Sequence, residues 1–152
     1  METTHKSSSH VQMHAEDIIF QKVAALLGIT LERNPKVFLA DNASTFMQPD
    51  FYSAEDKVVG EIFAHIGKPK KAQGNKIAND ILKMLLLEKT TGKHYRKIIV
   101  VCDIEEQKSL EGKSVLAESI RQFGIEILYI ELDAETQMQI LKAQELQKMT
   151  NV

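Results

Sequence analysis

Apolar residues recur at intervals of three and four in four segments of the chain, and this spacing predicts helices. These segments are 16–27, 72–89, 116–123 and a last one that starts after Asp133, its N-cap, and reaches about residue 149. Residues 1–15 are polar and predict a flexible tail. In the longest helix we expect one apolar stripe to face the core, formed by Ala78, Ile81, Leu82, Leu85 and Leu86.

Five other runs have the composition of strands: 36–40, 45–52, 58–64, 98–102 and 125–132. The turns between the first three are too short for a crossover, which predicts an antiparallel meander. The continuous apolar run 98–102 predicts a strand that is buried on both faces. The order α-β-β-β-α-β-α-β-α therefore predicts a three-layer α/β/α fold, in which helices cover both faces of a mixed five-stranded sheet.

The composition narrows the class of protein. Of the 152 residues, 43% are hydrophobic and 26% charged, which excludes a disordered chain and suits one domain, placed here at residues 16–152. No apolar run approaches the ~20 residues that span a bilayer, so we expect no membrane partner, and the polar start of the chain favours the cytoplasm. The single cysteine, Cys102, excludes a disulfide framework and a cysteine-built zinc site, and we expect it to be a buried core residue.

Charge is distributed unevenly along the chain. The net charge is −4 over residues 1–64, +7 over residues 65–97 and −5 over residues 98–152. A basic block between two acidic ones indicates a polyanionic partner such as nucleic acid. The alternative is a solvated helix face with charged flanking loops.

Two acidic residues stand in the second and third predicted strands. Asp50 follows Pro49, a residue that cannot donate to a strand ladder and marks an edge or a bulge. Glu61 interrupts an apolar run. If the turn at 55–57 joins the two strands as a hairpin, the carboxylates lie close together, and Mg²⁺ would relieve their repulsion because it binds through one or two protein carboxylates. The alternative is that Asp50 ends a turn and Glu61 faces solvent.

The helix after Glu61 opens with Gln73 and Lys76, so both lie near one end of the same sheet. A phosphate held there would meet the helix N-terminus, the Lys76 ammonium group and the metal. The alternative is that Lys76, Asp80 and Lys83 form ion pairs on the helix surface, each worth roughly a few tenths of a kcal/mol.

This element order, with Pro49-Asp50 on the second strand and Glu61-Ile62-Phe63 on the third, resembles the PD-(D/E)XK nuclease superfamily, which has the restriction-endonuclease-like fold. The resemblance covers about residues 16–102. It implies that Asp50 and Glu61 bind Mg²⁺, or Mn²⁺ in its place. In the superfamily a lysine two residues after the second acid orients or activates the attacking water, and Phe63 stands at that position here.

Some members of the superfamily place this lysine on the following helix. The resemblance then assigns the role to Lys76, with Lys68 as the second choice, while Gln73 matches a glutamine of some nucleases and Glu16 an acid that completes the metal shell. It implies a Mg²⁺-dependent endonuclease acting on DNA. A homodimer is a further arrangement that the sequence leaves open. The residues expected to contact phosphates are Gln73, Lys68, Lys70, Lys71 and Lys83.

Two other functions stay open at this point. One is a nucleic-acid-binding protein of the same fold that lost catalysis together with the lysine at position 63. The other is a homodimeric protein–protein adaptor that uses the acidic last helix. We also expect Asp103, directly after the strand 98–102, to cap a helix or to end a turn.

Overall fold

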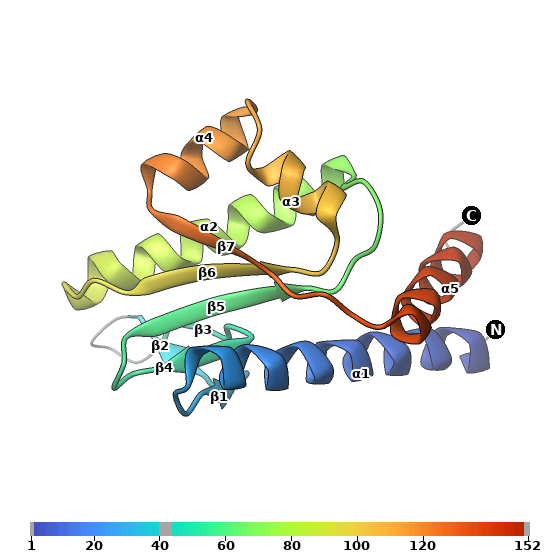
Figure 1. Ribbon diagram of the computed structural model, residues 1–152. Coiled ribbons are helices and arrows are strands. Elements are labelled where there is room, and N and C mark those ends of the chain that lie inside the picture. The colour runs from blue at the N-terminus through green and yellow to red at the C-terminus, as the bar shows by residue number, and fades with distance from the viewer. Residues whose placement is uncertain (1, 40–43, 151–152) are drawn as a thin grey trace.

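The computed structural model describes residues 2–39 and 44–150, and Figure 1 shows how the elements of this part are arranged. The helices are α1 (Glu2–Leu27), α2 (Lys71–Thr91), α3 (Ile104–Leu110), α4 (Val115–Gln122) and α5 (Ala134–Thr150). The strands are β1 (Glu32–Arg33), β2 (Val37–Phe38), β3 (Phe46–Met47), β4 (Phe51–Ser53), β5 (Val58–Phe63), β6 (Arg96–Val101) and β7 (Ile125–Tyr129). Among these helices, none has both the length and the apolar character that crossing a membrane requires.

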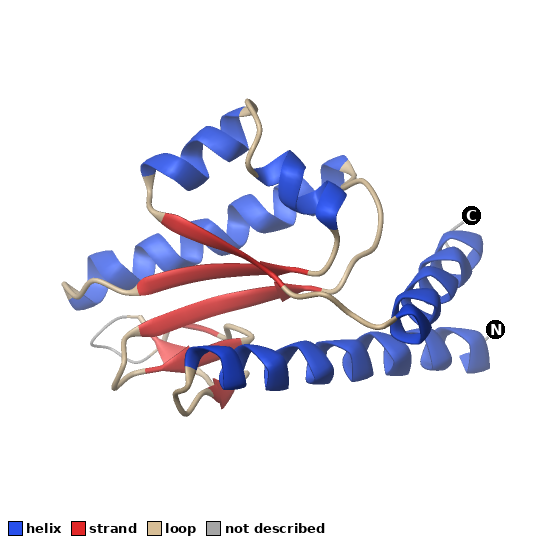
Figure 2. Ribbon diagram, viewed as in Figure 1, coloured by secondary structure: helices blue, strands red, loops and turns tan. Residues whose placement is uncertain are grey.

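Five strands form one mixed sheet in the order β1-β4-β5-β6-β7, which confirms the predicted kind of sheet. β1, β4 and β5 pair antiparallel, whereas β5, β6 and β7 pair parallel (Figure 2). Parallel neighbours need a long connection, and α2 makes the first crossover while α3 and α4 make the second. β2 and β3 form a separate two-stranded sheet.

Two predicted strands pair with each other as expected but lie in a separate sheet. The run 36–40, whose last residue lies outside the described part, and the first half of the run 45–52 pair with each other as β2 and β3. Pro49 interrupts the second run, so only β4 reaches the main sheet. The outer strand there is β1, whose two residues are too few to show a strand pattern in the sequence.

The helices also differ from the prediction at two places. α1 begins at Glu2, where we expected a polar tail up to residue 15, because α5 packs along this part of α1 and Ala15 is buried. The short helix α3 is an addition to the predicted order. Asp103 caps it as expected, since its Oδ1 accepts a hydrogen bond from the N–H of Glu105 at 2.7 Å.

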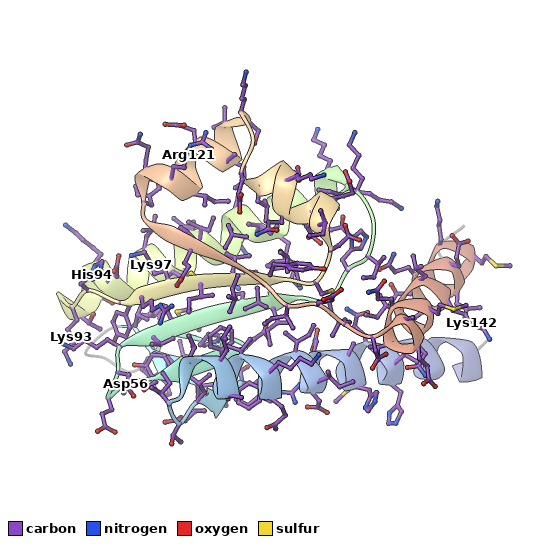
Figure 3. All side chains as sticks on the ribbon, in the orientation of Figure 1. Asp56, Lys93, His94, Lys97, Arg121 and Lys142 are labelled. Atoms are coloured by element: carbon purple, nitrogen blue, oxygen red, sulfur yellow. The ribbon has the colours of Figure 1, made fainter. Side chains whose placement is uncertain are left out.

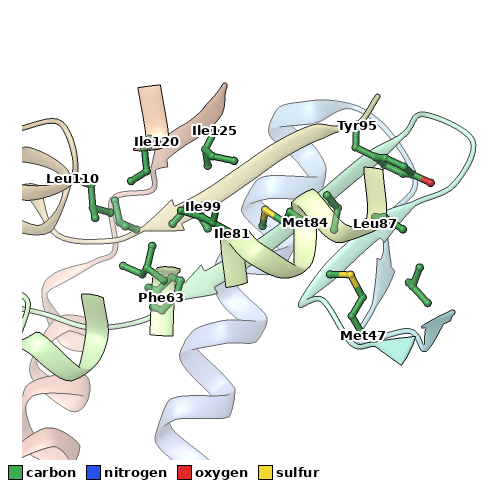
Figure 4. Packing of buried hydrophobic residues seen from close by; sticks show 14 of the residues in the cluster. Met47, Phe63, Ile81, Met84, Leu87, Tyr95, Ile99, Leu110, Ile120 and Ile125 are labelled. Carbon is green, nitrogen blue, oxygen red and sulfur yellow. The ribbon is translucent and has the colours of Figure 1, made fainter. Parts of the chain in front are cut away.

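Helices cover both faces of the main sheet, which confirms the three-layer α/β/α arrangement (Figures 1 and 2). On one face, Ile19 of α1 and Ile140 of α5 are buried with Ile62 and Val100 of the sheet. Cys102 is buried in the same core, as expected. On the other face, α2, α3, α4 and the small sheet enclose the core of Figure 4, which includes Met47, Phe63, Ile81, Met84, Ile99, Leu110 and Ile120.

The register of β4 against β5 depends on a glycine. Phe51 pairs with Gly60 across the ladder, and the Phe51 side chain is fully buried. A Cβ atom on Gly60 would lie 2.0 Å from the Cζ of Phe51, so a side chain there would have to displace the ring. Gly60 thus permits the register that brings Asp50, which precedes Phe51, next to Glu61, which follows Gly60.

Candidate active site

The structure brings Asp50 and Glu61 together where β4 and β5 separate. Asp50 lies directly before β4, not inside a strand, and its Oδ2 accepts a hydrogen bond from the N–H of Ile62 at 2.7 Å. The Glu61 side chain is buried, with 7% of the residue exposed, so the alternative of a solvent-facing Glu61 is wrong. The predicted proximity of the two carboxyl groups is therefore correct.

Burial raises the pKa of Glu61 to about 10, and the neighbouring charges of Asp50 and Asp80 and a hydrogen bond with Asp50 raise it too. Lys83 acts in the opposite direction and is outweighed. The Glu61 carboxyl is therefore protonated at neutral pH and can share its proton with Asp50. A divalent cation that bound both groups would replace this proton.

Glu16 of α1 faces the same site from the other layer of the fold. Burial raises the pKa of Glu16, and the charge of Asp50 raises it further, while Lys76 and Arg33 lower it. These interactions place the carboxyl of the first helix close to Asp50 and to the ammonium group of α2. Of the predicted site residues, Asp50 thus interacts both with Glu61 and with Glu16, and Glu16 also interacts with Lys76.

Lys76 of α2 lies beside Phe63, the residue two positions after Glu61. Its Nζ lies 5.2 Å from the centroid of the Phe63 ring, within the range of a cation–π interaction. Phe63 itself is buried in the core on the α2 side of the sheet. Lys76 also lowers the pKa of Glu16 and of Asp80, so its positive charge lies among these carboxyl groups.

Asp80 belongs to this cluster, although we expected it on the polar side of α2. The residue is 4% exposed, its Oδ2 has no hydrogen-bond partner among the described residues, and Lys83 Nζ lies 3.7 Å from its Oδ1. Burial raises its pKa. The predicted stripe of α2 was right only for Ile81 and Leu85, since Leu82 and Leu86 are exposed. The buried positions are Ile77, Asp80, Ile81, Met84 and Leu87.

A cavity of about 160 Å³ lies at the C-terminal end of β5, between α1, α2 and α5. Glu16, Gln73 and Lys76 line it together with Phe63 and His65. The Oε1 atom of Gln73 is already bonded, because it accepts a hydrogen bond from the N–H of residue 70 at 2.6 Å. His65 was not among the predicted site residues. Its only signal in the sequence is that it directly follows the predicted strand 58–64, at the end of the sheet where the other site residues were expected.

The basic block is divided between the two ends of α2. Lys68, Lys70 and Lys71 are exposed at its N-terminal end, next to the cavity. A helix of this length spans roughly 30 Å, so the lysines beyond its other end lie far from the site. There Lys97 is buried and its Nζ lies 2.8 Å from Glu88, close to Lys93 and His94 in Figure 3. Only the lysines at the N-terminal end of α2 are therefore close enough to contact a ligand at the cavity.

The donor set suits Mg²⁺ better than a softer metal, because every candidate ligand is a carboxylate oxygen. The described residues contain no ready group of three or more histidine, cysteine, aspartate or glutamate ligands. Mg²⁺ does not need one, since it keeps several waters and binds through one or two carboxylates. When ionised, the carboxyl groups of Glu16, Asp50, Glu61 and Asp80 outnumber the cationic groups that act on them, Lys76, Lys83 and Arg33, so the cluster keeps a negative charge that a cation would neutralise. The orphaned Oδ2 of Asp80 points to the same need for a positive partner.

Comparison with known proteins assigns no family to this chain. No protein-family model matches it, and neither a curated protein nor a solved structure does. The function must therefore be inferred from the carboxyl cluster, the lysine of α2 and the cavity beside them.

Proposed function

We propose that this protein is a Mg²⁺-dependent phosphodiesterase of the PD-(D/E)XK type that cleaves DNA as an endonuclease. The observation that carries the proposal is the position of Lys76, whose Nζ lies 5.2 Å from the ring centre of Phe63. The residue that replaces the motif lysine and the lysine that would act for it are in contact. The paired carboxyl groups of Asp50 and Glu61 support the same proposal.

In this proposal each residue of the cluster has a separate task. Asp50 and Glu61 would hold the metal ion, and the carboxyl group of Glu16 on α1 would act on it only through its charge, because no third ligand is in place among the described residues. When bound, Mg²⁺ polarises the scissile phosphate and makes a bound water more acidic. Lys76 orients the attacking water and stabilises the charge that develops on the phosphate oxygens.

The exposed lysines before α2 would hold the DNA strand on either side of the cleaved bond. Their ammonium groups would contact backbone phosphates and would not distinguish one base sequence from another; these residues are Lys68, Lys70 and Lys71. Gln73 adds an amide group that lines the cavity. Such contacts release counterions, so we expect binding to weaken steeply as the salt concentration rises.

Moving the lysine back to the strand tests the proposal. Lys76→Ala should cleave duplex DNA in Mg²⁺ or Mn²⁺ roughly 10²- to 10³-fold more slowly than the wild type, because the charge at the phosphate is lost. The double variant Phe63→Lys with Lys76→Ala should regain part of that rate. Lys113→Ala, an exposed lysine between α3 and α4, is the control and should cleave like the wild type. A wild type that cleaves no DNA, or Lys76→Ala at the full rate, would overturn the proposal.

A second function has a specific observation in its favour. Phe63 is buried where the motif has a lysine, and the described residues offer no ready group of three metal ligands. Both features also suit a nucleic-acid-binding protein that has lost catalysis. Salt-sensitive DNA binding that is unaffected by Mg²⁺, without cleavage, would support it. The adaptor has less support, because α5 buries Ile140 and Ala143 within its own chain.

A further inference from the structure

The segment 64–67, which follows β5, is held by side chains from three other parts of the fold. The Gln12 amide donates a hydrogen bond to its first carbonyl at 2.8 Å. The side chain of Gln144 donates a hydrogen bond to the carbonyl of residue 66 at 3.0 Å and accepts one from the N–H of residue 66 at 2.9 Å. Asp103 accepts from the N–H of its last residue at 2.9 Å. The backbone that carries His65 is thus fixed from α1, α5 and the start of α3, as a catalytic side chain requires.

Behind His65 lies a buried carboxyl group that has no hydrogen-bond partner. Glu106 of α3 is fully buried, and neither of its oxygens is hydrogen-bonded within the described part of the chain. Its Oε2 lies 3.8 Å from Nδ1 of His65, which is itself buried without a hydrogen bond. A buried carboxyl without a partner is costly, so the arrangement calls for a proton shared between Glu106 and His65. The two atoms need to approach by less than 1 Å to form that hydrogen bond.

The environment of the pair sets where its proton resides. Burial lowers the pKa of His65, and Lys70 lowers it further, while Asp103 raises it. Burial raises the pKa of Glu106 to about 7, and Asp103 adds to this rise. The other ionisable groups around His65 are Cys102, which lies under its carbonyl, and Glu16 and Lys76, which line the same cavity. At neutral pH the imidazole is therefore neutral, and the carboxyl behind it is partly protonated.

We propose that His65 is a catalytic residue that protonates the leaving oxygen of the phosphodiester, and that Glu106 is the positioning residue that supplies it with a proton. This rests on the proposed phosphodiesterase function. The water oxygen bonds to phosphorus and releases its proton to solvent as the bond from phosphorus to the leaving oxygen breaks. The proton on Nε2 moves to the leaving oxygen, and the Glu106 proton moves to Nδ1. The imidazole stays neutral, Glu106 ends as a carboxylate, and solvent restores the proton.

A substrate that needs no proton at the leaving atom tests this role. One DNA duplex has ordinary linkages, and a second has sulfur in place of the bridging oxygen that leaves, because a thiolate departs unprotonated. His65→Asn should cleave the ordinary duplex roughly 10²- to 10⁴-fold more slowly than the wild type but the sulfur-bridged duplex at about the wild-type rate. Glu106→Gln should also slow only the cleavage of the ordinary duplex, by a smaller factor. Its cleavage rate should no longer change with pH near pH 7, as the wild-type rate does. His94→Asn is the control, since His94 lies beside Glu88 at the other end of α2.

The outcomes separate this inference from the proposed function. Cleavage of the sulfur-bridged duplex shows that each variant is folded. If His65→Asn slows both duplexes equally, or slows neither, the role of His65 is wrong while the nuclease stands. If the wild type cleaves neither duplex, the proposed function fails and the role of His65 fails with it.

Discussion

Replacing Glu61 by glutamine tests the buried carboxyl pair through the pH dependence of stability. In the unfolded chain Glu61 ionises near its ordinary pKa of 4.5, whereas in the folded protein its pKa is raised to about 10. Between these two values the folded state binds one more proton than the unfolded state, so the free energy of unfolding falls as the pH rises. The slope is about 1.4 kcal/mol per pH unit, which amounts to about 2.7 kcal/mol between pH 6 and pH 8.

Glutamine has nearly the shape of a protonated glutamate but does not ionise. Its amide can donate a hydrogen bond to Asp50 as the protonated carboxyl does. We expect Glu61→Gln to match the wild type only below about pH 4.5, where the carboxyl is protonated in both states, and its advantage in stability to grow by about 2–3 kcal/mol between pH 6 and pH 8. Urea unfolding in EDTA at pH 6, 7 and 8, followed by circular dichroism, measures the difference. Glu118→Gln is the control, because the pKa of the exposed Glu118 is lowered by its hydrogen bonds and that carboxyl stays ionised throughout this range. Parallel pH slopes for the wild type and Glu61→Gln would refute the reasoning.

Three further outcomes follow from the same structure. Mg²⁺ should compete with the proton of the carboxyl pair, so its affinity should rise up to about tenfold per pH unit in calorimetric titrations, and a pH-independent affinity would contradict this. Gly60→Ala should lower the free energy of unfolding by about 1–3 kcal/mol because its Cβ would overlap the Phe51 ring, whereas Gly74→Ala, with 3.8 Å to the nearest atom, should be neutral or stabilising; equal effects in urea unfolding would be inconsistent with the packing. Gln144→Leu should lower the free energy of unfolding by about 1–3 kcal/mol, since it leaves the N–H and the carbonyl of residue 66 without their partner. An unchanged rate of hydrogen exchange at the amide of residue 66 would contradict this.

The sequence was sufficient where local signals decide the structure. Turn residues and the two hydrophobic periodicities predicted most helices and the mixed sheet, and the caps at Asp103 and Asp133 form as expected. The Asp50–Glu61 pair was also predictable, because a hairpin brings residues on either side of its turn together. These signals all lie within a few residues of the feature that they predict.

Features that depend on distant segments were not predictable in the same way. α1 starts well before Glu16, and α5, more than a hundred residues later, packs against it. β1 is a strand because β4 pairs with it, although two residues show no pattern. His65 and Glu106 approach each other because β5 pairs with β6 and because the short helix α3, which was not predicted, follows β6 and carries Glu106.

The orientation of α2 shows why the site residues of this helix were the hardest to predict. Leucines occur on several sides of α2, so the sequence alone does not decide which stripe faces the sheet. In the structure Ile77, Met84 and Leu87 are buried and Leu82 is exposed. This orientation turns Asp80 inward and brings Lys76, one turn earlier, above the ring of Phe63. The packing of α2 on the sheet therefore fixes the position of the ammonium group beside Phe63, a position that the pattern of leucines alone does not predict.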